Sequence, residues 1–417
     1  MERESNMSVI SNQAETFLHA LSEELEIPSH FYEQAENSYK SFARWLHRDA
    51  SAVHAYSPDV YVQGSFRLGT AIRPPSEEDE YDVDSVCVLR KLSKEDLSQA
   101  SLKALLEKET KNYRKARSII KPVKEGRRCW TLEYADGAQF HMDILPALIN
   151  AQDQRILLEN SNFDAQWAET AIAITDNEVD NFNQITSDWP RSNPKGYAAW
   201  FISQMGDVFT RQREVLLEEK RKNNIKASIE DIPDYKVRTP LQSAIMILKR
   251  HRDEMFIDDT ENKKPISIIL TTLCAHAYGG EETIGESLFS ILNQMDEYIR
   301  HDGECYKIAN PTDNTENFAD KWEDYPERSK AFFDWLKQVR EDFYSSAKLS
   351  DHKVIAESLG ARFGDSVIKR TISRLAGIGV FTGSSLLKPA SAAPKTEDSD
   401  FSFSDKPRSP SKPQDFA

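Results

Sequence analysis

QGSFRLGT (residues 63–70) and YDVDSVCVL (residues 81–89) decide the fold of this chain. The first stretch is a Gly-Ser turn, and the second is an apolar, β-branched run that carries two aspartates one residue apart. Because strand side chains alternate between faces, Asp82 and Asp84 point to one side and Val83 to the other. Adjacent carboxylates repel each other unless a cation lies between them, and Mg²⁺ is usually held by one or two carboxylates plus substrate phosphates. With a Gly-Ser backbone turn to cradle phosphates, the pattern predicts a nucleoside triphosphate site with two metal ions.

A second strand supplies a third carboxylate. In AQFHMDIL (residues 138–145), alternation places polar side chains on one face, namely Gln139, His141 and Asp143, and apolar ones on the other. Three carboxylates from two neighbouring strands are a scaffold for two ions about 3.5–4 Å apart. His141, beside Asp143, is interpreted as a residue that supports the metal ligands or packs next to them, rather than as a metal ligand. The alternative, a solvated acidic loop over residues 76–84, is disfavoured by the valines and leucine around the aspartates.

These motifs resemble the DNA polymerase β-type nucleotidyltransferase superfamily. Within it the chain is similar to the bacterial cGAS/DncV-like nucleotidyltransferases (CD-NTases), over roughly residues 55–325, in GSFRLGTAIRP, YDVDSVCVL, FHMDILPAL, SNPKGYAAWF, TPLQSAIMILKRHRD, KPISIILTTL and NPTDNTENFADKW. The resemblance implies an α+β fold: a polymerase β-like core with a mixed sheet, a C-terminal helical lobe, and an active site in the cleft between them. It also implies a function, the joining of NTPs into a cyclic oligonucleotide second messenger, most simply a cyclic dinucleotide, with release of pyrophosphate, in anti-phage defence.

The resemblance further implies roles for individual residues. Asp82 and Asp84 would hold two Mg²⁺ ions (with Mn²⁺ as an alternative) and the triphosphate, and Asp143 would complete one metal site and help to activate the attacking ribose hydroxyl. Gly64 and Ser65 would contact the β- and γ-phosphates, and Gln63 belongs to the same nucleotide site. Lys249 matches the family's helical lysine that reaches the triphosphate, and Ser267 matches a serine at a helix start near the same phosphates. A solvated lysine and an ordinary first-turn serine are the alternatives.

Helix signals support the placement of these last two residues. Thr239-Pro240 reads as an N-cap followed by proline at the first helical position. A helical repeat then enters the core with Leu241, Ala244, Ile245, Leu248, Arg252 and Met255. Lys249 lies one residue beyond this apolar stripe. Pro265 is predicted to open a second helix, with Ser267 in its first turn, where free N–H groups favour phosphate.

Composition describes a chain long enough for two domains. It has 417 residues, of which 39% are hydrophobic, and no stretch of it approaches the length of a membrane span. The polar N-terminus disfavours a secretory signal, so we expect a cytoplasmic protein. Four scattered cysteines, without a Cys-x-x-Cys pair, predict reduced thiols and disfavour zinc: Cys87, Cys129, Cys274 and Cys305.

The net charge of −15 bears on partners. Proteins that follow long nucleic acids normally carry a basic surface, and here the one dense basic stretch is residues 111–128. We interpret it as a solvated helix and a connecting loop, with a surface for an activator or nucleotide as the alternative. Small nucleotides, ATP and GTP among them, are therefore the predicted substrates, and a downstream effector would bind the product.

Three segments are predicted along the chain. Residues 1–190 form the nucleotidyltransferase core with a long N-terminal helix over Phe31, Ala35, Tyr39, Phe42 and Trp45. Residues 191–382 form a helical domain, which begins with an Asn193 cap and Pro194. Residues 383–417 are rich in Ser, Pro, Lys and Asp and are predicted to be a disordered tail. The family resemblance makes the C-terminus a candidate for ubiquitin-like conjugation or a regulatory partner.

Three other functions remain open from the sequence. The first is a linear nucleotidyltransferase of the same superfamily that acts on tRNA, another RNA or a protein, as toxins do. The second is a catalytically inactive binding scaffold, and the third is a metal-dependent phosphohydrolase. Asn310, Asn317 and Tyr278 are candidate base or ribose contacts, although packing or capping roles are the preferred interpretation for them. The bases used, the ring size and the linkage cannot be read from the sequence.

Overall fold

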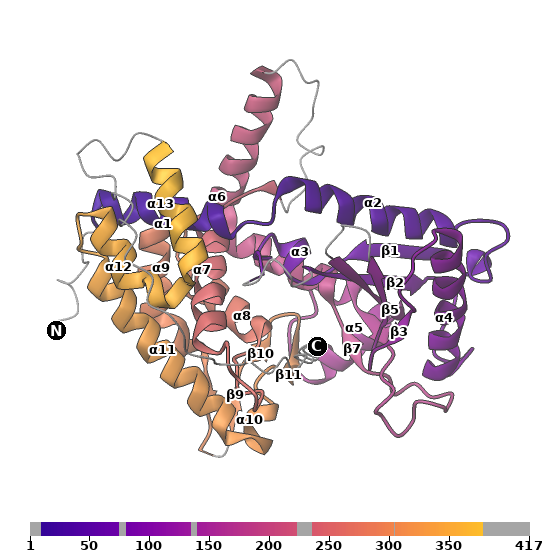
Figure 1. The fold of residues 1–417 in the computed structure, drawn as a ribbon. Coiled ribbons are helices and arrows are strands. Elements are labelled where there is room, and N and C mark those ends of the chain that lie inside the picture. Colours follow the sequence, from indigo (N-terminus) through magenta and orange to yellow (C-terminus); the bar gives the residue numbers. More distant parts are fainter. Residues whose placement is uncertain (1–9, 75–80, 135–139, 223–235, 304, 378–417) are drawn as a thin grey trace, which may run out of the picture.

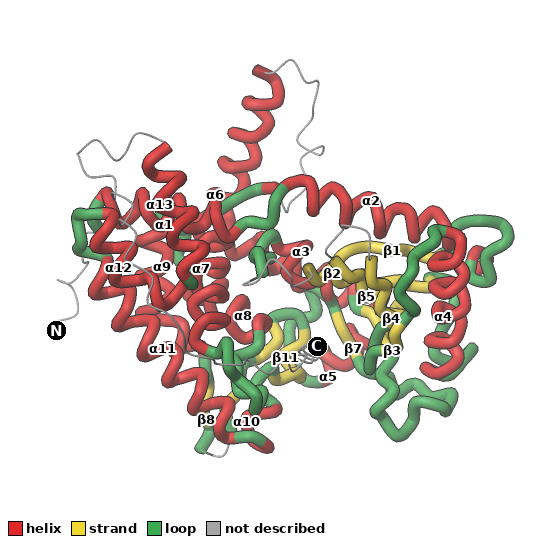
Figure 2. Tube along the Cα trace, in the orientation of Figure 1, coloured by secondary structure: helices red, strands yellow, loops and turns green. Residues whose placement is uncertain are grey.

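The computed structural model describes residues 10–74, 81–134, 140–222, 236–303 and 305–377 (Figure 1). Two lobes make up this part of the chain, one built on a mixed sheet and one built of helices (Figure 2). The elements of the sheet lobe are α2 (Ser29–Leu46), β1 (Pro58–Val62), α3 (Gly64–Leu68), β2 (Tyr81–Leu89), α4 (Gln99–Ala116), β3 (Lys124–Glu125), β4 (Trp130–Tyr134), β5 (Phe140–Ile149), α5 (Ala151–Asn160), β6 (Ile172–Ile174) and β7 (Arg191–Ser192).

The sheet has the order β1-β2-β5-β4-β3, and β6 also pairs with β5 and carries β7 at its side. Strands β2 and β5 are parallel, and the other pairs are antiparallel, so the predicted mixed sheet is confirmed. The long strand β5 pairs with β4 along its first half and with β6 along its second half. This arrangement places β2 and β5, the two strands with the aspartates, side by side in the sheet.

The two faces of the sheet are covered differently. Alternate residues of β2 and β5, such as Val83 and Met142, pack with α2 and α4 in one core. On the opposite face the strands carry a smaller apolar cluster that includes Val86 and Leu145. The aspartates lie on this second face, because their neighbour Val83 is turned into the main core. Helix α2 is the predicted helix, with Ala35 and Phe42 fully buried.

The helical lobe consists mainly of helices, as predicted, with two additional short hairpins. Its elements are α1 (Asn12–Leu25), α6 (Pro194–Lys222), α7 (Pro240–Met255), α8 (Ser267–Ala277), α9 (Ile284–Gln294), β8 (Arg300–His301), β9 (Tyr306–Lys307), β10 (Ala309–Asn310), β11 (Asp313–Asn317), α10 (Lys321–Asp324), α11 (Pro326–Ser346), α12 (His352–Phe363) and α13 (Asp365–Gly377). Helix α1 packs in the core of this lobe, for instance through Phe17 and Leu21, and not on the sheet. Figure 1 shows it beside α13, the last described helix.

The position of α1 matters for the predicted domains. A boundary at residue 190 assigns α1 to the sheet lobe by sequence, whereas its packing partners belong to the helical lobe. Glu24 of α1 accepts hydrogen bonds from Arg370 at 3.2 Å and from Arg374 at 2.7 Å, both on α13. The two ends of the described chain therefore close the helical lobe together. The predicted tail over residues 383–417 lies outside the described residues.

Several helix starts agree with the sequence signals. Asn193 caps α6 through a bond from the Gly196 N–H, and Thr239 caps α7 with a complete capping box that includes Gln242. The prediction for Met255 is wrong, because its side chain is 39% exposed at the end of α7. Helix α8 begins at Ser267, two residues later than the predicted start at Pro265, with Ile266 as its N-cap.

Side chains of α7, together with Arg238 just before it, hold the segment that follows α3. They donate to four backbone carbonyls of the sheet lobe: Gln242 to Leu68 at 2.9 Å, Arg238 to Gly69 at 2.7 Å, Lys249 to Thr70 at 3.0 Å, and Arg250 to Arg73. Such bonds satisfy carbonyls that a buried loop would otherwise leave unpaired. The helical lobe therefore fixes the loop behind the Gly-Ser turn directly.

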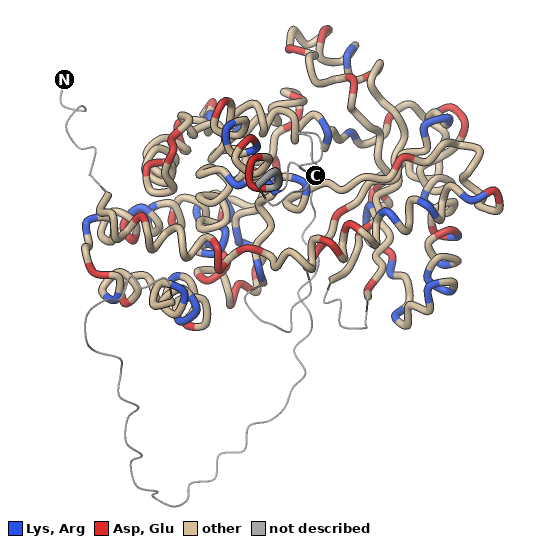
Figure 3. Tube along the Cα trace, turned by 90° about the horizontal axis from the view of Figure 1, so that it is seen from above, with Lys and Arg blue, Asp and Glu red and all other residues tan. Residues whose placement is uncertain are grey.

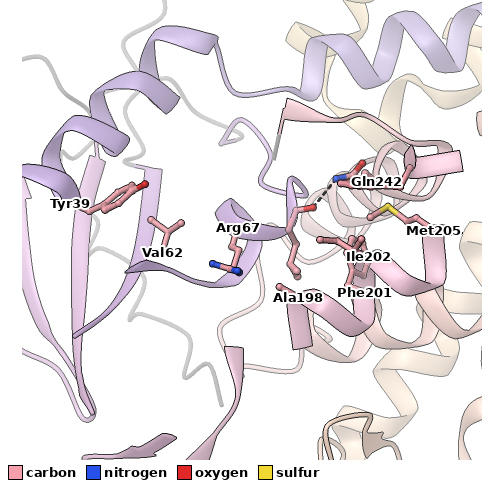
Figure 4. A pocket seen from close by; sticks show the side chains of 10 residues that line it. Tyr39, Val62, Arg67, Ala198, Phe201, Ile202, Met205 and Gln242 are labelled. Carbon is pink, nitrogen blue, oxygen red and sulfur yellow. Dashed lines mark hydrogen bonds between the residues drawn. The ribbon is translucent and has the colours of Figure 1, made fainter. Parts of the chain in front are cut away.

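A cavity of about 170 Å³ lies beside this contact between the lobes. Its lining is mostly apolar, with Val62 from β1 on one side and Phe201 and Ile202 from α6 on the other. Figure 4 shows Arg67 of α3 between these two sides, with the bond from Gln242 dashed. The cavity marks the place where α3 is packed between the sheet and the helices.

Charged residues of both signs follow one another along both lobes (Figure 3). The basic stretch at residues 111–128 covers the end of α4, a loop and β3, with Lys111, Lys115 and Arg117 exposed. This location agrees with a solvated helix and connecting loop. Within the described ranges, no helix combines the length and the apolar character needed to cross a membrane.

Candidate active site

Three carboxylates meet on one face of the sheet. Strands β2 and β5 run parallel in a register that pairs Asp84 with Asp143 and Asp82 with His141. Each aspartate presents one carboxylate oxygen, and these three oxygens lie within 4.8 Å of one another. The predicted convergence of Asp82, Asp84 and Asp143 is thus confirmed. Gln139, predicted on the same face, lies outside the described residues.

The electrostatics of this cluster suit a divalent cation. Burial raises the pKa of Asp84 well above its usual value, and the charges of Asp82 and Asp143 raise it further. The pKa of Asp143 is also raised, first by burial and then by the charge of Asp82. Neighbouring carboxylates that resist ionisation together gain the most from a cation placed between them. Three hard oxygen ligands of this kind fit Mg²⁺ or Mn²⁺.

His141 lies next to the cluster rather than inside it. Its Nε2 is 3.2 Å from Oδ1 of Asp82, whose side chain is 41% exposed. The imidazole can therefore steady the most exposed of the three carboxylates. This contact agrees with the predicted place of His141 beside the metal ligands.

The Gly-Ser turn packs directly against Asp84. Gly64 has a φ of +62°, and a Cβ atom on it would lie only 2.5 Å from Oδ2 of Asp84. The N–H of Gln63 donates to the backbone carbonyl of Asp84 at 2.9 Å. Ser65 is tied to the following loop, because its carbonyl accepts from the N–H of Thr70 at 2.9 Å. The structure therefore places Gln63 and Gly64 against Asp84, with Ser65 next in the same turn, and the phosphate contacts of the three residues stay a prediction.

Lys249 is buried and not a solvated helix residue. Only 4% of it is exposed, and its Nζ donates to the carbonyl of Thr70 at 3.0 Å and to the Thr70 hydroxyl at 3.3 Å. Burial, together with the charge of Arg252, lowers the pKa of Lys249 to about 7. The amine thus lies on the loop that follows the Gly-Ser turn. Its contact with a triphosphate stays a prediction.

Ser267 stands at the first position of α8, as a helix-start serine should. Its Oγ accepts a hydrogen bond from Nη1 of Arg252 at 3.0 Å. The same Nη1 of Arg252 also donates to the carbonyl of Pro265. Ser267 is therefore held by the helix α7 that also carries Lys249. Its phosphate contact likewise stays a prediction.

The candidate base contacts have structural partners of their own. Asn317 accepts from the N–H groups of Ile308 and Ala319, and Asn310 accepts from the N–H of Thr312. The hydroxyl of Tyr278 donates to the carbonyl of Glu281 at 2.7 Å. These bonds agree with the packing and capping roles preferred for the three residues: Asn310, Asn317 and Tyr278. All four cysteines are free.

Sequence reasoning missed the neighbours of Asp143. The hydroxyl of Thr131 donates to Oδ1 of Asp143 at 2.5 Å, and the thiol of Cys129 lies close to the same carboxylate. From the other side, the hydroxyl of Ser85 donates to the backbone carbonyl of Asp143 at 2.8 Å. The alternation of WTLEY predicts a strand but not its partner. No signal in a single sequence fixes the register that places Thr131 opposite Asp143.

Comparison with known proteins agrees with this geometry. The family model described as "Cyclic GMP-AMP synthase DncV-like, nucleotidyltransferase domain" matches residues 58–146. A curated protein of Roseivirga ehrenbergii, described as a c-di-GMP synthase, is 29% identical over 386 residues, which cover 91% of this chain and 93% of that protein.

Solved structures show the same fold at lower identity. The CD-NTase CdnG of Bradyrhizobium diazoefficiens, in complex with GTP, superposes with a TM-score of 0.63 at 20% identity over 87% of this chain and 98% of its own. The E. coli MS115-1 CdnC:HORMA-deltaN complex gives a TM-score of 0.55 at 14% identity over 84% of this chain and 96% of its own. With a sheet that holds three converging aspartates beside a Gly-Ser turn and a helical lobe behind it, the chain carries a DncV-like nucleotidyltransferase domain over residues 58–146 and is similar along most of its length to a c-di-GMP synthase.

Proposed function

We propose that this enzyme joins two nucleoside triphosphates into a cyclic dinucleotide and that GTP is among its substrates. The observation that carries the proposal is the set of three carboxylates on neighbouring strands beside the Gly-Ser turn. The choice of GTP is supported by the c-di-GMP synthase that is similar over 91% of the chain, and the GTP-bound structure adds support for the shared fold.

The reaction consists of two like steps. A ribose hydroxyl oxygen of one nucleotide attacks the α-phosphorus of another, its proton is lost, and the bond to pyrophosphate breaks. The second step repeats this exchange within the linear intermediate and closes the ring. Each step forms one phosphodiester bond, breaks one α–β phosphoanhydride bond, and releases one pyrophosphate and one proton.

The residues present assign parts of this chemistry. Asp82 and Asp84 would bind two Mg²⁺ ions together with the donor triphosphate, and Asp143 would complete the site toward the acceptor hydroxyl. Two ions bound there would stabilise the attacking and leaving oxygens. The N–H groups of the Gly64-Ser65 turn would bind the terminal phosphates, since such turns form anion-binding concavities. Position and charge, rather than a covalent intermediate, then carry the catalysis.

The loop behind the turn gives Lys249 a role in the same proposal. Its amine lies at the carbonyl of Thr70, on the segment that α7 holds in place. A triphosphate bound at the turn would raise the proton affinity of this amine, because a nearby negative charge favours the charged form. Ser267 would contribute from the first turn of α8.

The decisive experiment identifies the product. The purified chain is incubated with Mg²⁺ and labelled GTP, ATP, CTP and UTP, singly and in pairs, and the products are treated with phosphatase and analysed by mass spectrometry. A phosphatase-resistant cyclic dinucleotide is expected, and it should disappear with EDTA. A labelled RNA or protein would instead favour the linear transferase, and orthophosphate release would favour the phosphohydrolase.

A variant pair links the product to the site. The double variant Asp82→Ala with Asp84→Ala should lose synthesis by roughly 10²-fold or more, the scale on which one electrostatic stabiliser acts. It should remain folded in metal-free buffer, because two mutually repelling charges are removed. Asp207→Ala, at an exposed position of α6, serves as the matched control and should keep full activity. Retained synthesis in the double variant would exclude this site.

A further inference from the structure

Asp143 is held on one side by a polar cluster from the neighbouring strand. Strand β4 is antiparallel to β5, and its register places Thr131 directly opposite Asp143. The Thr131 hydroxyl donates to Oδ1 of Asp143 at 2.5 Å. The Cys129 thiol, two residues before, lies close to the same carboxylate. The Thr131 hydroxyl therefore reaches the carboxylate of Asp143 from the side of β4, while the other two aspartates of the site approach from β2.

The backbone turn that leads into β4 is itself held in place. Lys103 of α4 is buried, with only 2% of it exposed. Its Nζ donates to the carbonyls of Gly126 at 2.6 Å and Arg127 at 2.9 Å. The N–H of Gly126 donates to the carbonyl of Cys129 at 3.0 Å. A Cβ atom on Gly126 would lie 2.7 Å from the Cys129 sulfur, so glycine leaves room for this side chain. The turn before β4 thus holds the thiol in one place.

We propose that Thr131 is a positioning residue that fixes the rotation of the Asp143 carboxylate, so that its remaining lone pairs face the metal site. The inference rests on the proposed function, since it assigns this donor to a metal-binding carboxylate. A carboxylate at the end of a rotatable bond loses orientational freedom when one oxygen accepts hydrogen bonds. Partners of metal ligands that act in this way typically change metal affinity or activity 10–100-fold when they are removed.

Hydrogen bonds hold Asp143 at two points, one on its side chain and one on its main chain. Oδ1 accepts from Thr131, and the backbone carbonyl of Asp143 is occupied by the Ser85 hydroxyl. Both the main chain and the side chain of Asp143 are therefore held by the strands on either side, β2 and β4. A valine at position 131 would fill the same space without a donor, and a serine would restore the donor without the methyl group.

Thr131→Val, Thr131→Ser and Cys129→Ala are compared with the wild type in two measurements. The first is Mn²⁺ binding in the absence of nucleotide, followed by electron paramagnetic resonance of the free ion. The second is the Mg²⁺ dependence of synthesis, with kcat and KM determined separately. Thr131→Val should weaken Mn²⁺ binding about 10-fold or more and lower kcat at saturating NTP, within the ~10–100-fold expected for such partners. Cys129→Ala, which leaves the Thr131 donor in place, should have a smaller effect than Thr131→Val, and Thr131→Ser should recover most of both values.

Thr110→Val is the matched control. Thr110 is a fully buried threonine of α4 in the same lobe, and its hydroxyl has no hydrogen-bond partner. This substitution should leave both measurements unchanged, which separates the loss of a donor from the loss of a buried threonine. Circular dichroism melting of all variants checks that each one is folded.

Unchanged Mn²⁺ affinity in Thr131→Val, or failure of Thr131→Ser to recover it, would overturn the assignment. A wild type that does not bind Mn²⁺ would overturn both this inference and the metal site of the proposed function. If the wild type binds Mn²⁺ but yields no cyclic product from any NTP mixture, the proposed function fails on its own. The comparison of Mn²⁺ affinities would still decide whether Thr131 positions Asp143.

Discussion

At the scale of single residues, the site depends on how closely the backbone approaches a carboxylate. Gly64 has a left-handed φ of +62°, and Oδ2 of Asp84 occupies the space that a Cβ atom on residue 64 would need. Gly64→Ala should therefore destabilise the fold by about 1–2 kcal/mol, the cost of an L residue in this conformation. It should also lower synthesis by about 10²-fold, because a displaced turn or carboxylate misplaces the reacting groups. Thermal melting and the synthesis assay measure the two effects.

Gly280→Ala provides the control for this prediction. Gly280 also has a positive φ, +89°, but nothing lies within 4 Å of the position that its Cβ would take. The substitution should thus reproduce the loss of stability without the loss of activity. Equal losses of activity in the two variants would show that strain alone, and not the approach to Asp84, explains the glycine at position 64.

At the scale of elements, a buried histidine connects helices α7 and α11 of the helical lobe. His251 of α7 is fully buried; its Nε2 lies 2.9 Å from Oδ2 of Asp342 on α11, and its Nδ1 accepts from the indole N–H of Trp335 at 3.2 Å. Because Nδ1 accepts a hydrogen bond from Trp335, the proton of the neutral ring is on Nε2, and this N–H donates to Asp342. Burial lowers the pKa of His251, despite the opposing effect of Asp342.

This shift makes stability depend on pH. The unfolded chain takes up a proton on His251 near its ordinary pKa of about 6.5, whereas the folded chain does so only at lower pH. Below about pH 6.5 the unfolded state binds more protons, so the free energy of unfolding falls as the pH falls, by at most about 1.4 kcal/mol per pH unit from this group. Urea unfolding at pH 7.5 and 5.5 should show a smaller difference for His251→Gln than for the wild type.

His19→Gln is the control for the pH experiment, because the His19 side chain is 66% exposed. Its unfolding free energy should change with pH as that of the wild type does. His251→Gln should also be less stable than the wild type at pH 7.5, since the partners on α11 lose a buried hydrogen bond. If His251→Gln kept the full pH dependence, another group would have to be responsible.

At the scale of the whole molecule, one arginine ties the two lobes together. Arg238, just before α7, donates to the carbonyl of Gly69 behind the Gly-Ser turn, to Glu26 at the end of α1, and to the hydroxyl of Tyr32 on α2. Arg238→Met keeps the length of the side chain and removes its donors. We expect a loss of about 1–3 kcal/mol, because buried acceptors are left unpaired, together with reduced synthesis. Urea unfolding and the synthesis assay test this.

Arg211→Met is the corresponding surface change. Arg211 pairs with Glu282, and the two side chains are 52% and 74% exposed. Such pairs contribute at most about 1 kcal/mol, so this variant should keep nearly all of its stability and its activity. A similar loss in both variants would argue that Arg238 acts as an ordinary surface charge and does not couple the lobes.

The sequence by itself determined the chemistry of the site. Alternation within YDVDSVCVL and FHMDIL places three aspartates opposite apolar side chains, and the capping signals at Asn193 and Thr239 begin α6 and α7 at the right residues. These properties depend on a few neighbouring residues, because strand and helix periodicities are local. The strand alternation and the helix caps could therefore be predicted without knowing which element packs against which.

Only the tertiary structure decided which surfaces meet. It placed Thr131 and Cys129 against Asp143, buried Lys249 on the loop behind the turn, and packed α1 in the helical lobe instead of on the sheet. Each of these contacts joins segments that are distant in the chain or depend on one strand register. Such contacts are fixed by the burial of apolar surface over the whole lobe. One local sequence pattern is compatible with many different sets of tertiary contacts.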